Sequence, residues 1–215
     1  MIRLTRTQAR AIDRISIDEF GMPEILLMEN AAINATNMIR RRFGNLRNSF
    51  DVWCGGGNNG GDGLAIARHL HNAGCSTRVR LASDEFSALA SIHLNIIRKM
   101  PIEIVEPFDR EIEAGAVQID ALLGTGASRE VSGKIADAIA CINGAALPVV
   151  AIDVPSGLDC DLGEPLGSAV RASVTITFVA PKVGFANPNA TRYLGEVMIA
   201  EIGCPKEAIE RAVRE

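Results

Sequence analysis

Three stretches of this sequence combine glycines with polar or acidic side chains, a pattern typical of a site that binds a polar small molecule. The first runs from Gly55 to Gly63 and contains six glycines, two asparagines and one aspartate. It follows an apolar run and precedes a helical pattern. Glycines let a backbone approach a phosphate closely, and a helix N-terminus offers unpaired N–H groups to an anion. The stretch therefore predicts a loop that binds a phosphate-bearing ligand.

The same loop leaves more than one function open. It satisfies G-x-G-x-x-G, and Asp84 or Glu85 could bind a ribose, so an NAD-dependent dehydrogenase is one alternative. A glycine-rich turn without any ligand is another. The loop has no Lys followed by Ser or Thr, which disfavours a Walker-type nucleotide triphosphatase. Asn58, Asn59 and Asp62 add directional groups that a simple pyrophosphate loop does not need, so we expect them to orient a polar ligand.

The other two stretches carry acidic residues at the ends of apolar runs. Asp120 lies in VQIDALLG, and Asp153 closes PVVAID. A carboxylate is costly to bury unless it binds a cation, accepts hydrogen bonds or exchanges protons with a substrate. One such aspartate is usually a cap or turn former. Two such aspartates beside a glycine loop favour a ligand-binding or catalytic site over two separate caps or turns.

Hard oxygen donors are also available near these strand ends. The side chains of Asn59, Asp120 and Ser156 suit an alkali ion or another hard cation and are unlike a zinc set. The segment from Gly124 to Arg129 offers a second flexible loop that could hold a phosphate, with Arg129 to neutralise its charge. That segment fits a surface turn equally well.

Composition excludes several broad classes. The chain has 215 residues, with 22 basic and 26 acidic side chains, and its net charge of −4 gives no support to nucleic-acid binding. Its five cysteines are widely spaced and form no C-x-x-C pair, which indicates a reducing, cytoplasmic compartment. We expect neither a secretory signal nor a membrane span, because long apolar runs are missing.

The apolar runs alternate with amphipathic stretches in the order typical of βαβ units. The sequence predicts strands at 50–54, 77–82, 102–105, 117–124, 148–153, 173–179 and 195–202. It predicts helices at 64–73 and 135–143, and another helix that follows the strand at 77–82 and ends near 99. Residues before about 47 read as helical, with Thr7 as a cap and Met28, Ala32, Ala35 and Ile39 on one buried face. We therefore predict an α/β fold, a Rossmann-like three-layer α/β/α sandwich with a mainly parallel central sheet and N-terminal helices. Residues 1–215 would form a single domain, with a helical part at about 1–47 and an α/β core at about 48–205.

Several motifs taken together resemble the NAD(P)H-hydrate epimerase family, the YjeF N-terminal domain. They are GGGNNGGDGLAIARHL, DALLGTG, AIDVPSGLDCDLG, TFVAPKVGF and YLGEVMIAEIG, preceded by TQARAIDR and GMPEILLMENAA. The resemblance spans about residues 5 to 205. It implies an isomerase that interconverts the R and S forms of hydrated NADH and NADPH, without a redox cofactor. It also implies a homodimer and a separate dehydratase that consumes the S form.

The resemblance implies site residues at the matching positions. The substrate contacts are Asn58, Asn59, Gly60, Gly61, Asp62, Gly124, Thr125, Gly126, Ala127, Ser128, Arg129, Glu130 and Asp153. One potassium ion per subunit would bind Asn59, Asp120 and Ser156. Because similar domains also occur as non-catalytic binding modules, an interaction role stays open as an alternative.

Asp153 is the residue we expect to carry the chemistry. The substrate has a hydroxyl at C6 beside the ring nitrogen, so loss of the hydroxyl and re-addition from the other face would invert that carbon. Asp153 would protonate the departing hydroxyl and activate the returning water, provided that its surroundings let it hold a proton near neutral pH. Lys182 could contribute electrostatically, but we expect it to be an ordinary surface lysine.

Overall fold

A computed structural model describes residues 2–44, 48–108 and 111–215. The strands are β1 (Ser49–Cys54), β2 (Ser76–Leu81), β3 (Glu103–Val105), β4 (Val117–Ala121), β5 (Val149–Ile152), β6 (Val174–Phe178) and β7 (Glu196–Ala200). The α-helices are α1 (Arg6–Asp18), α2 (Glu24–Phe43), α3 (Asn58–Asn72), α4 (Ala88–Ile97), α5 (Gly133–Gly144), α6 (Thr191–Leu194) and α7 (Lys206–Ala212). Two short 3-10 helices, Val183–Ala186 and Pro188–Ala190, follow β6.

The strands form one sheet in the order β3-β2-β1-β4-β5-β6-β7, and each pairs with its neighbours in parallel. The predicted α/β sandwich is therefore confirmed. The chain moves outward in one direction from β1 to β3, then returns to the other side of β1 at β4. A reversal of this kind leaves a crevice at the carboxyl ends of the two central strands, where such sheets bind ligands.

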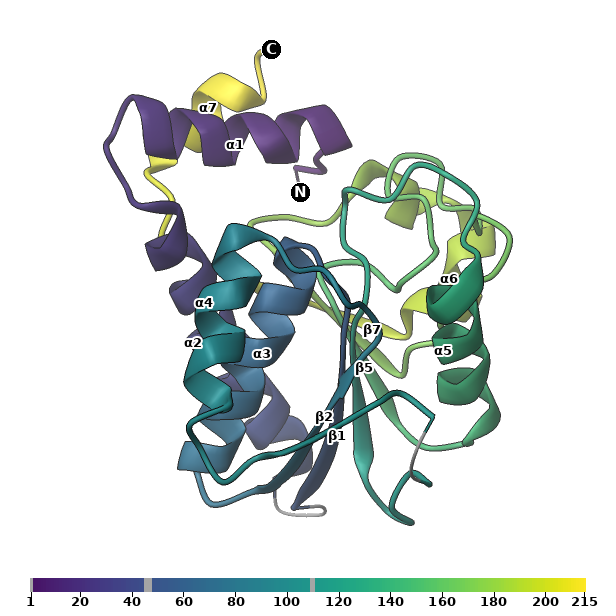
Figure 1. Ribbon diagram of the computed structural model, residues 1–215. Helices are drawn as coiled ribbons and strands as arrows, with labels where there is room; N and C mark the ends of the chain where they lie inside the picture. The colour runs from purple at the N-terminus through teal and green to yellow at the C-terminus, as the bar shows by residue number, and fades with distance from the viewer. Residues whose placement is uncertain (1, 45–47, 109–110) are drawn as a thin grey trace.

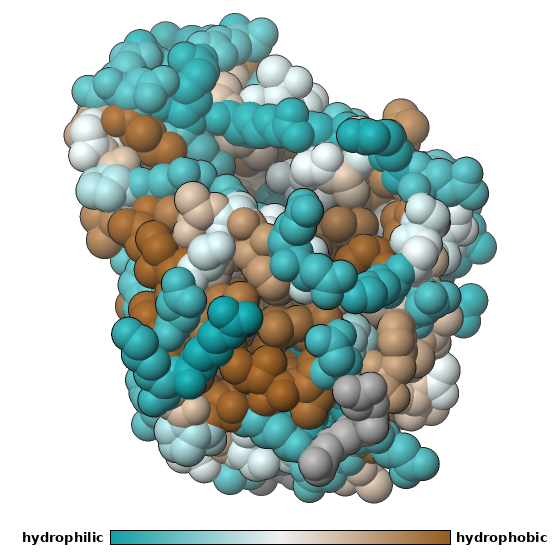
Figure 2. All heavy atoms as spheres, viewed as in Figure 1, coloured by the Kyte–Doolittle hydropathy of each residue, from teal (hydrophilic) through white to brown (hydrophobic). Residues whose placement is uncertain are grey.

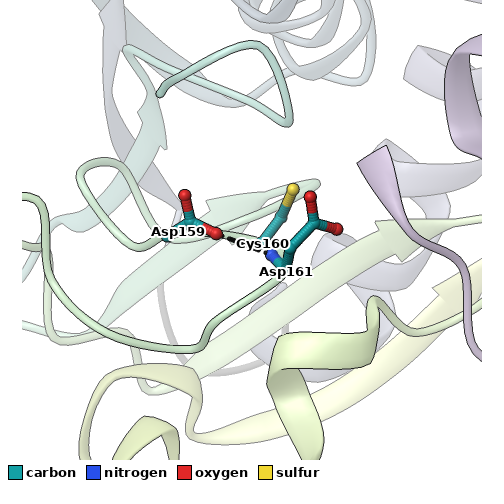
Figure 3. Close-up of side chains that lie close together, drawn as sticks. All are labelled: Asp159, Cys160 and Asp161. Carbon is teal, nitrogen blue, oxygen red and sulfur yellow. Dashed lines mark hydrogen bonds between the residues drawn. The ribbon is translucent and has the colours of Figure 1, made fainter. Parts of the chain in front are cut away.

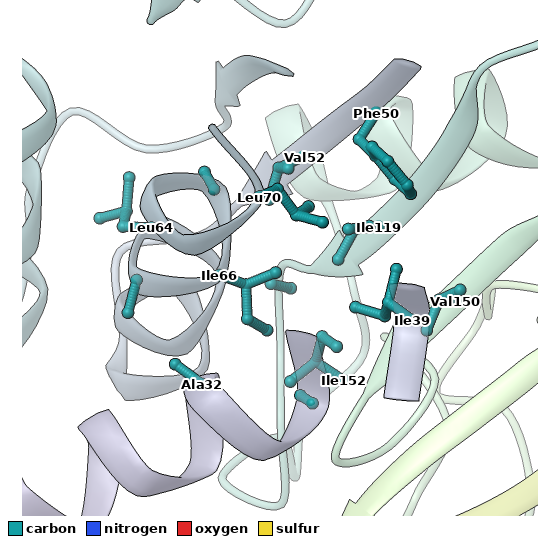
Figure 4. Packing of buried hydrophobic residues seen from close by; sticks show 14 of the residues in the cluster. Ala32, Ile39, Phe50, Val52, Leu64, Ile66, Leu70, Ile119, Val150 and Ile152 are labelled. Carbon is teal, nitrogen blue, oxygen red and sulfur yellow. The ribbon is translucent and has the colours of Figure 1, made fainter. Parts of the chain in front are cut away.

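Helices cover both faces of the sheet, α2, α3 and α4 on one side and α5 and α6 on the other (Figure 1). Side chains of β1 alternate between these layers, because successive residues of a strand point to opposite faces. Phe50 and Val52 pack against α2 and α3, while Trp53 packs towards α5. Figure 4 shows the first layer, where Ile39 of α2 and Ile66 of α3 meet the sheet. Burying one such aliphatic side chain contributes roughly 1.5–3 kcal/mol.

The N-terminal helices confirm the predicted buried face of α2, on which Met28, Ala32, Ala35 and Ile39 are all buried. The predicted cap of α1 is wrong. Thr5 begins the helix instead of Thr7, because the Thr5 hydroxyl accepts from the backbone of Gln8 and the Gln8 side chain accepts from the backbone of Thr5. The predicted end of the helical part, near residue 47, lies outside the described residues.

Helix α1 packs against α7 beyond the carboxyl edge of the sheet, and the sequence did not predict α7 (Figure 1). Leu4, Ile12, Ile15 and Ala208 share the buried cluster between them. Hydrophilic residues cover the outer side of this pair (Figure 2). Within the described part of the chain, none of the helices has the length and apolar character needed to cross a membrane.

Candidate active site

A cavity of about 620 Å³ opens at the reversal point of the sheet. The carboxyl ends of five strands, β1, β2, β4, β5 and β6, contribute to its wall, and α1 adds Arg10 and Asp13. Its lining residues are Arg10, Asp13, Gly56, Gly57, Asn58, Asn59, Asp62, Ala82, Ser83, Leu122, Leu123, Gly124, Thr125, Gly126, Ala127, Ile135, Asp153 and Phe178. A smaller cavity of about 90 Å³ adjoins it and shares Asp13, Asn58, Asp62 and Phe178. The predicted glycine loop and Asp153 thus meet in one cavity, whereas Asp120 and Ser156 are fully buried and do not line it.

Some positions of the glycine loop, Gly55 to Gly63, leave no room for a side chain. A Cβ atom at Gly55 would lie 2.0 Å from the carbonyl oxygen of Leu122, and one at Gly60 would lie 1.9 Å from the carbonyl oxygen of Gly55. Helix α3 begins at Asn58, six residues earlier than the predicted start at 64, and no side chain caps it. Its first N–H groups therefore face the cavity end of β1 as donors for an anion.

The predicted contacts in this turn divide into two groups. Asn58, Asn59 and Asp62 line the cavity. Gly60 and Gly61 are buried and absent from its lining, because they pack against Gly55 and against Met28 of α2. Glycine at these two positions serves the approach of α3 to its neighbours.

The predicted contact residues of the second loop, Gly124 to Glu130, also fall into two groups. Residues 124–127 line the main cavity, whereas Ser128, Arg129 and Glu130 are exposed and line an adjoining pocket of about 280 Å³. Arg6, at the start of α1, holds the inner half in place. Its guanidinium donates to the carbonyl oxygens of Thr125 and Ala127, each at 2.7 Å.

Arg6 also binds the acidic segment that follows Ser156. Its side chain pairs with Asp159 at 3.0 Å, and its backbone N–H donates to Asp161 at 2.8 Å. Asp159, Cys160 and Asp161 lie close together (Figure 3) and are the one such group of three or more His, Cys, Asp or Glu side chains found among the described residues. Burial raises the pKa of Cys160 to about 11, so its thiol is protonated at neutral pH. This cluster anchors α1 to the site through Arg6.

Asp120, Ser156 and Asn59 converge on the turn that follows β4. The Asp120 carboxylate accepts from the backbone of Leu122 at 3.2 Å and from the backbone and hydroxyl of Ser156. The Ser156 hydroxyl accepts from the backbone of Leu123 at 2.8 Å. Asn59 lies beside Gly124, where an added Cβ would be 3.3 Å from the Asn59 Cβ.

This group contains two features that suit a hard cation. Both amide atoms of Asn59 are buried and have no hydrogen-bond partner among the residues described, an arrangement that normally costs free energy. Burial raises the pKa of Asp120 to about 6, against the lowering effect of the hydrogen bonds from Ser156. A cation between these oxygen donors would use the orphaned amide oxygen of Asn59 and the charge of Asp120.

Asp153 ends β5 in a left-handed backbone conformation, with φ of 65°. Its carboxylate lies 2.8 Å from the Lys182 ammonium and is close to Thr125 and Thr177. The prediction of Lys182 as a surface residue is wrong, since only 1% of it is exposed. Its ammonium also donates to the hydroxyl of Thr177 at 2.8 Å. Lys182 is buried because these acceptors replace the water that it loses.

Sequence reasoning missed a further carboxyl, Asp13 of α1, and assigned Asp62 to substrate contact only. The surrounding protein raises the pKa of Asp13 to about 6, together with the charges of Asp153 and Glu24, although its side chain stays open to the cavity. Burial, and then the charges of Asp153 and Asp13, raise the pKa of Asp62 well above its ordinary value. The dipole of α3 favours a negative charge near its N-terminus and therefore opposes this rise in pKa. Its effect is about 0.3–1 kcal/mol within the first turn and weaker at Asp62, the fifth residue of the helix.

The sequence matches known proteins over nearly its whole length. It is 37% identical to a protein of Rhodopirellula baltica named NAD(P)H-hydrate epimerase, over 97% of this chain and 87% of the relative. It is 38% identical to a protein of the same name from Pirellula staleyi, over 95% of this chain and 94% of the relative. A Salinibacter ruber protein named bifunctional NAD(P)H-hydrate repair enzyme Nnr is 39% identical over 97% of this chain. The chain spans only 42% of the length of that bifunctional relative.

A solved structure and a family model agree with these matches. The crystal structure of yeast ynu0 (YNL200c) superposes with a TM-score of 0.80 at 19% identity, over 93% of this chain and 87% of that one, and supports the fold. The model of the family described as YjeF-related protein N-terminus matches residues 24–184. That range includes the glycine turn, both acidic strand ends and Lys182. The chain belongs to the YjeF-related protein N-terminus family.

Proposed function

We propose that this protein is an NAD(P)H-hydrate epimerase, an isomerase that interconverts the R and S forms of hydrated NADH and NADPH. The observation that carries the proposal is the cavity at the β1–β4 reversal, which is lined both by the uncapped N-terminus of α3 and by the carboxyl groups of Asp62 and Asp153. The first suits the phosphates of a dinucleotide, and the second suits a hydroxylated ring. The names of the relatives at 37% and 38% identity support the same substrate.

The reaction needs no redox step. The ring nitrogen of the substrate donates its lone pair to C6, the C6–O bond breaks, and the oxygen leaves as water once it has taken a proton. Water then adds to the other face of the planar iminium and releases a proton. Asp153 lies in the cavity wall beside Lys182 and is our candidate for the group that exchanges protons at C6.

The loops supply binding and orientation. We propose substrate contacts at Asn58 to Asp62, at Gly124 to Glu130 and at Asp153. Among these, the cavity-lining members would contact the nicotinamide end most directly, and the exposed Ser128, Arg129 and Glu130 would contact the outer part of the dinucleotide. Asp84, the ribose partner that a dehydrogenase would use, instead pairs with Lys134 at 2.8 Å on the surface.

The direct test of this function is a chiral chromatographic assay. Purified protein mixed with the R form of hydrated NADPH should bring it to an equilibrium of R and S forms much faster than buffer alone. The absorbance of reduced nicotinamide should not change when candidate alcohols are added with NADP⁺. A dehydrogenase would show that absorbance change and no acceleration of the R-to-S conversion, whereas a non-catalytic binding module would show neither.

We propose that Asn59, Asp120 and Ser156 bind one potassium ion per subunit. Bound there, potassium would offset the negative charge of Asp120 next to the two loops. The proposal is supported by the orphaned amide of Asn59 and by the hard oxygen donors of the set.

Potassium should stabilise the protein more at about pH 7.5 than at about pH 5. The folded-state pKa of Asp120, about 6, lies above that of an unfolded chain. The stability contributed by this group is therefore fully present below about pH 4 and is lost as the pH rises through about 6. A bound cation should offset that loss by about 2.7 kcal/mol when its concentration is about 100 times its Kd.

The measurement is the melting temperature in potassium chloride against N-methylglucamine chloride at equal ionic strength. The Asp120→Asn variant should remove the difference in melting temperature between the two salts. A third measurement in sodium chloride shows whether the site distinguishes ions by size. Equal melting temperatures of the unaltered protein in both salts near pH 7.5 would count against this site.

Four further proposals concern the assembly, the location, the partner and the domain organisation of the protein. We propose a homodimer, a cytoplasmic location and a dehydratase as the functional partner, since an epimerase supplies such an enzyme with the epimer that it accepts. We also propose one domain over residues 1–215, because α1 and α7 pack together and Arg6 ties α1 to the second loop.

A further inference from the structure

Two carboxyl groups in the cavity, those of Asp62 and Asp153, have opposite surroundings. Asp153 has a cation at 2.8 Å, the ammonium of Lys182. Asp62 is only 9% exposed, and among the described residues nothing forms a hydrogen bond or an ion pair with its carboxyl group. Pairs of carboxyls whose surroundings differ in this way take different roles in proton transfer.

The charges that face Asp62 favour its neutral form. Helix α1 presents Asp13 and Arg10, α2 presents Glu24 in the adjoining cavity, and Asp153 lies at the end of β5 with Lys182 behind it. The guanidinium of Arg6 pairs with Asp159 and donates to the second loop, and it forms no ion pair with Asp62. Burial and the charges of Asp153 and Asp13 raise the pKa of Asp62. A carboxyl in these surroundings keeps its proton to higher pH than an ordinary aspartate does, as a proton donor must.

We propose that Asp62 is the proton donor of the reaction, giving its proton to the departing C6 hydroxyl, and that Asp153 beside Lys182 takes the proton from the returning water. This assignment rests on the epimerase function proposed above. It changes the initial expectation, in which Asp153 performed both transfers.

The step balances with groups present in the cavity. The Asp62 O–H bond breaks as its proton joins the C6 oxygen, the C6–O bond breaks, and the nitrogen lone pair forms the C6–N double bond. Water then forms a bond to C6 from the opposite face, the double-bond pair returns to nitrogen, and the proton of the water goes to Asp153. In the S-to-R direction Asp153 donates the proton to the departing hydroxyl and Asp62 accepts the proton of the water. One proton then returns from Asp153 to Asp62 through solvent in the cavity.

The two groups are attached to different elements, so they can reach a bound ring from different directions. Asp62 lies on α3, whereas Asp153 follows β5, and both line the same cavity. A single carboxyl can contact only one face of a bound ring, so inversion at C6 is served better by two groups than by one.

Two measurements test the assignment. Aspartate ¹³Cγ shifts, assigned through the backbone and followed by NMR during a pH titration, should show that Asp62 of the unaltered protein keeps its proton at pH 7. The Asp13→Asn variant should move that midpoint to lower pH, because a nearby negative charge is removed. Neither titration depends on catalysis.

The second measurement is the rate of R-to-S conversion. Asp62→Asn should lower kcat about 10²–10⁴-fold, while its circular dichroism spectrum and its dissociation constant for NADP⁺ stay close to those of the unaltered protein. Asp137→Asn, on the exposed side of α5, is the matched control and should keep the full rate.

The possible outcomes separate the two proposals. If the unaltered protein converts R to S and Asp62→Asn does so equally well, the donor role is overturned and the epimerase function stands. The donor role is also overturned if Asp62 titrates like an ordinary aspartate. If the unaltered protein gives no conversion, the epimerase function fails and the donor role fails with it.

Discussion

Asp153→Asn is expected to lower kcat for the R-to-S conversion about 10²–10⁴-fold, the usual contribution of a positioned acid–base group. An asparagine side chain has nearly the same shape but cannot take a proton from water. Asparagine also tolerates the left-handed backbone conformation of this residue, φ 65°, better than alanine does. Because the variant also leaves the buried Lys182 ammonium without its carboxylate partner, its circular dichroism spectrum is compared with that of the unaltered protein at the assay temperature, and a loss of rate in the folded variant comes from chemistry. Chiral chromatography of hydrated NADPH over a time course measures it.

Asp84→Asn is the matched control for this variant. Asp84 lies after β2 at the edge of the cavity region, but its side chain is 77% exposed and pairs with Lys134. The control should keep the full rate. Full activity in Asp153→Asn would contradict the assignment of this residue, and a large loss in Asp84→Asn would instead indicate a ribose contact of the dehydrogenase type.

Lys182→Met is expected to lower the free energy of unfolding by about 3–5 kcal/mol, because it leaves the Asp153 carboxylate without its partner. The two side chains are 2% and 13% exposed, so water cannot replace the lost ammonium. Methionine has a similar length and adds no clash. Urea unfolding followed by circular dichroism measures the change.

Two further variants isolate the ion pair. Lys134→Met removes a lysine that is half exposed and pairs with Asp84, and its unfolding midpoint should stay near that of the unaltered protein. The double variant Asp153→Asn with Lys182→Met should be more stable than Lys182→Met alone, because it leaves no unpaired charge buried. If Lys182→Met unfolds at the same urea concentration as Lys134→Met, the ion pair does not stabilise the fold.

The sheet and its core were largely predictable, because their signals are local. The run from Val149 to Ile152 is apolar on both faces, as a central parallel strand must be, and it forms β5. The four-three-four spacing along α2 likewise indicated its buried face. Boundaries were less predictable at α3, because its first residues are glycines and asparagines, which have low helix propensity. Packing against β4 and α2 makes them helical.

Part of the candidate site was predictable for a topological reason. Asp120 and Asp153 end neighbouring parallel strands, and the carboxyl ends of such strands share one edge. Lys182 was not predictable. It follows Ala-Pro in a segment that resembles a surface turn, and only its contacts with Asp153 and Thr177 explain its burial. Asp13 was missed because it occupies a helix that is otherwise polar on that side.

By itself, the sequence determined the succession of strands and of the helices between them up to α5, the buried face of α2 and the family, because these depend on residue types at short spacings. Only the tertiary structure decided which carboxyl in the cavity is paired and which is isolated. Asp13, Asp62, Asp153 and Lys182 come from four separate segments of the chain. The raised pKa values of Asp13 and Asp62 depend on burial and on charges that are near in space, and no local pattern in the sequence specifies these.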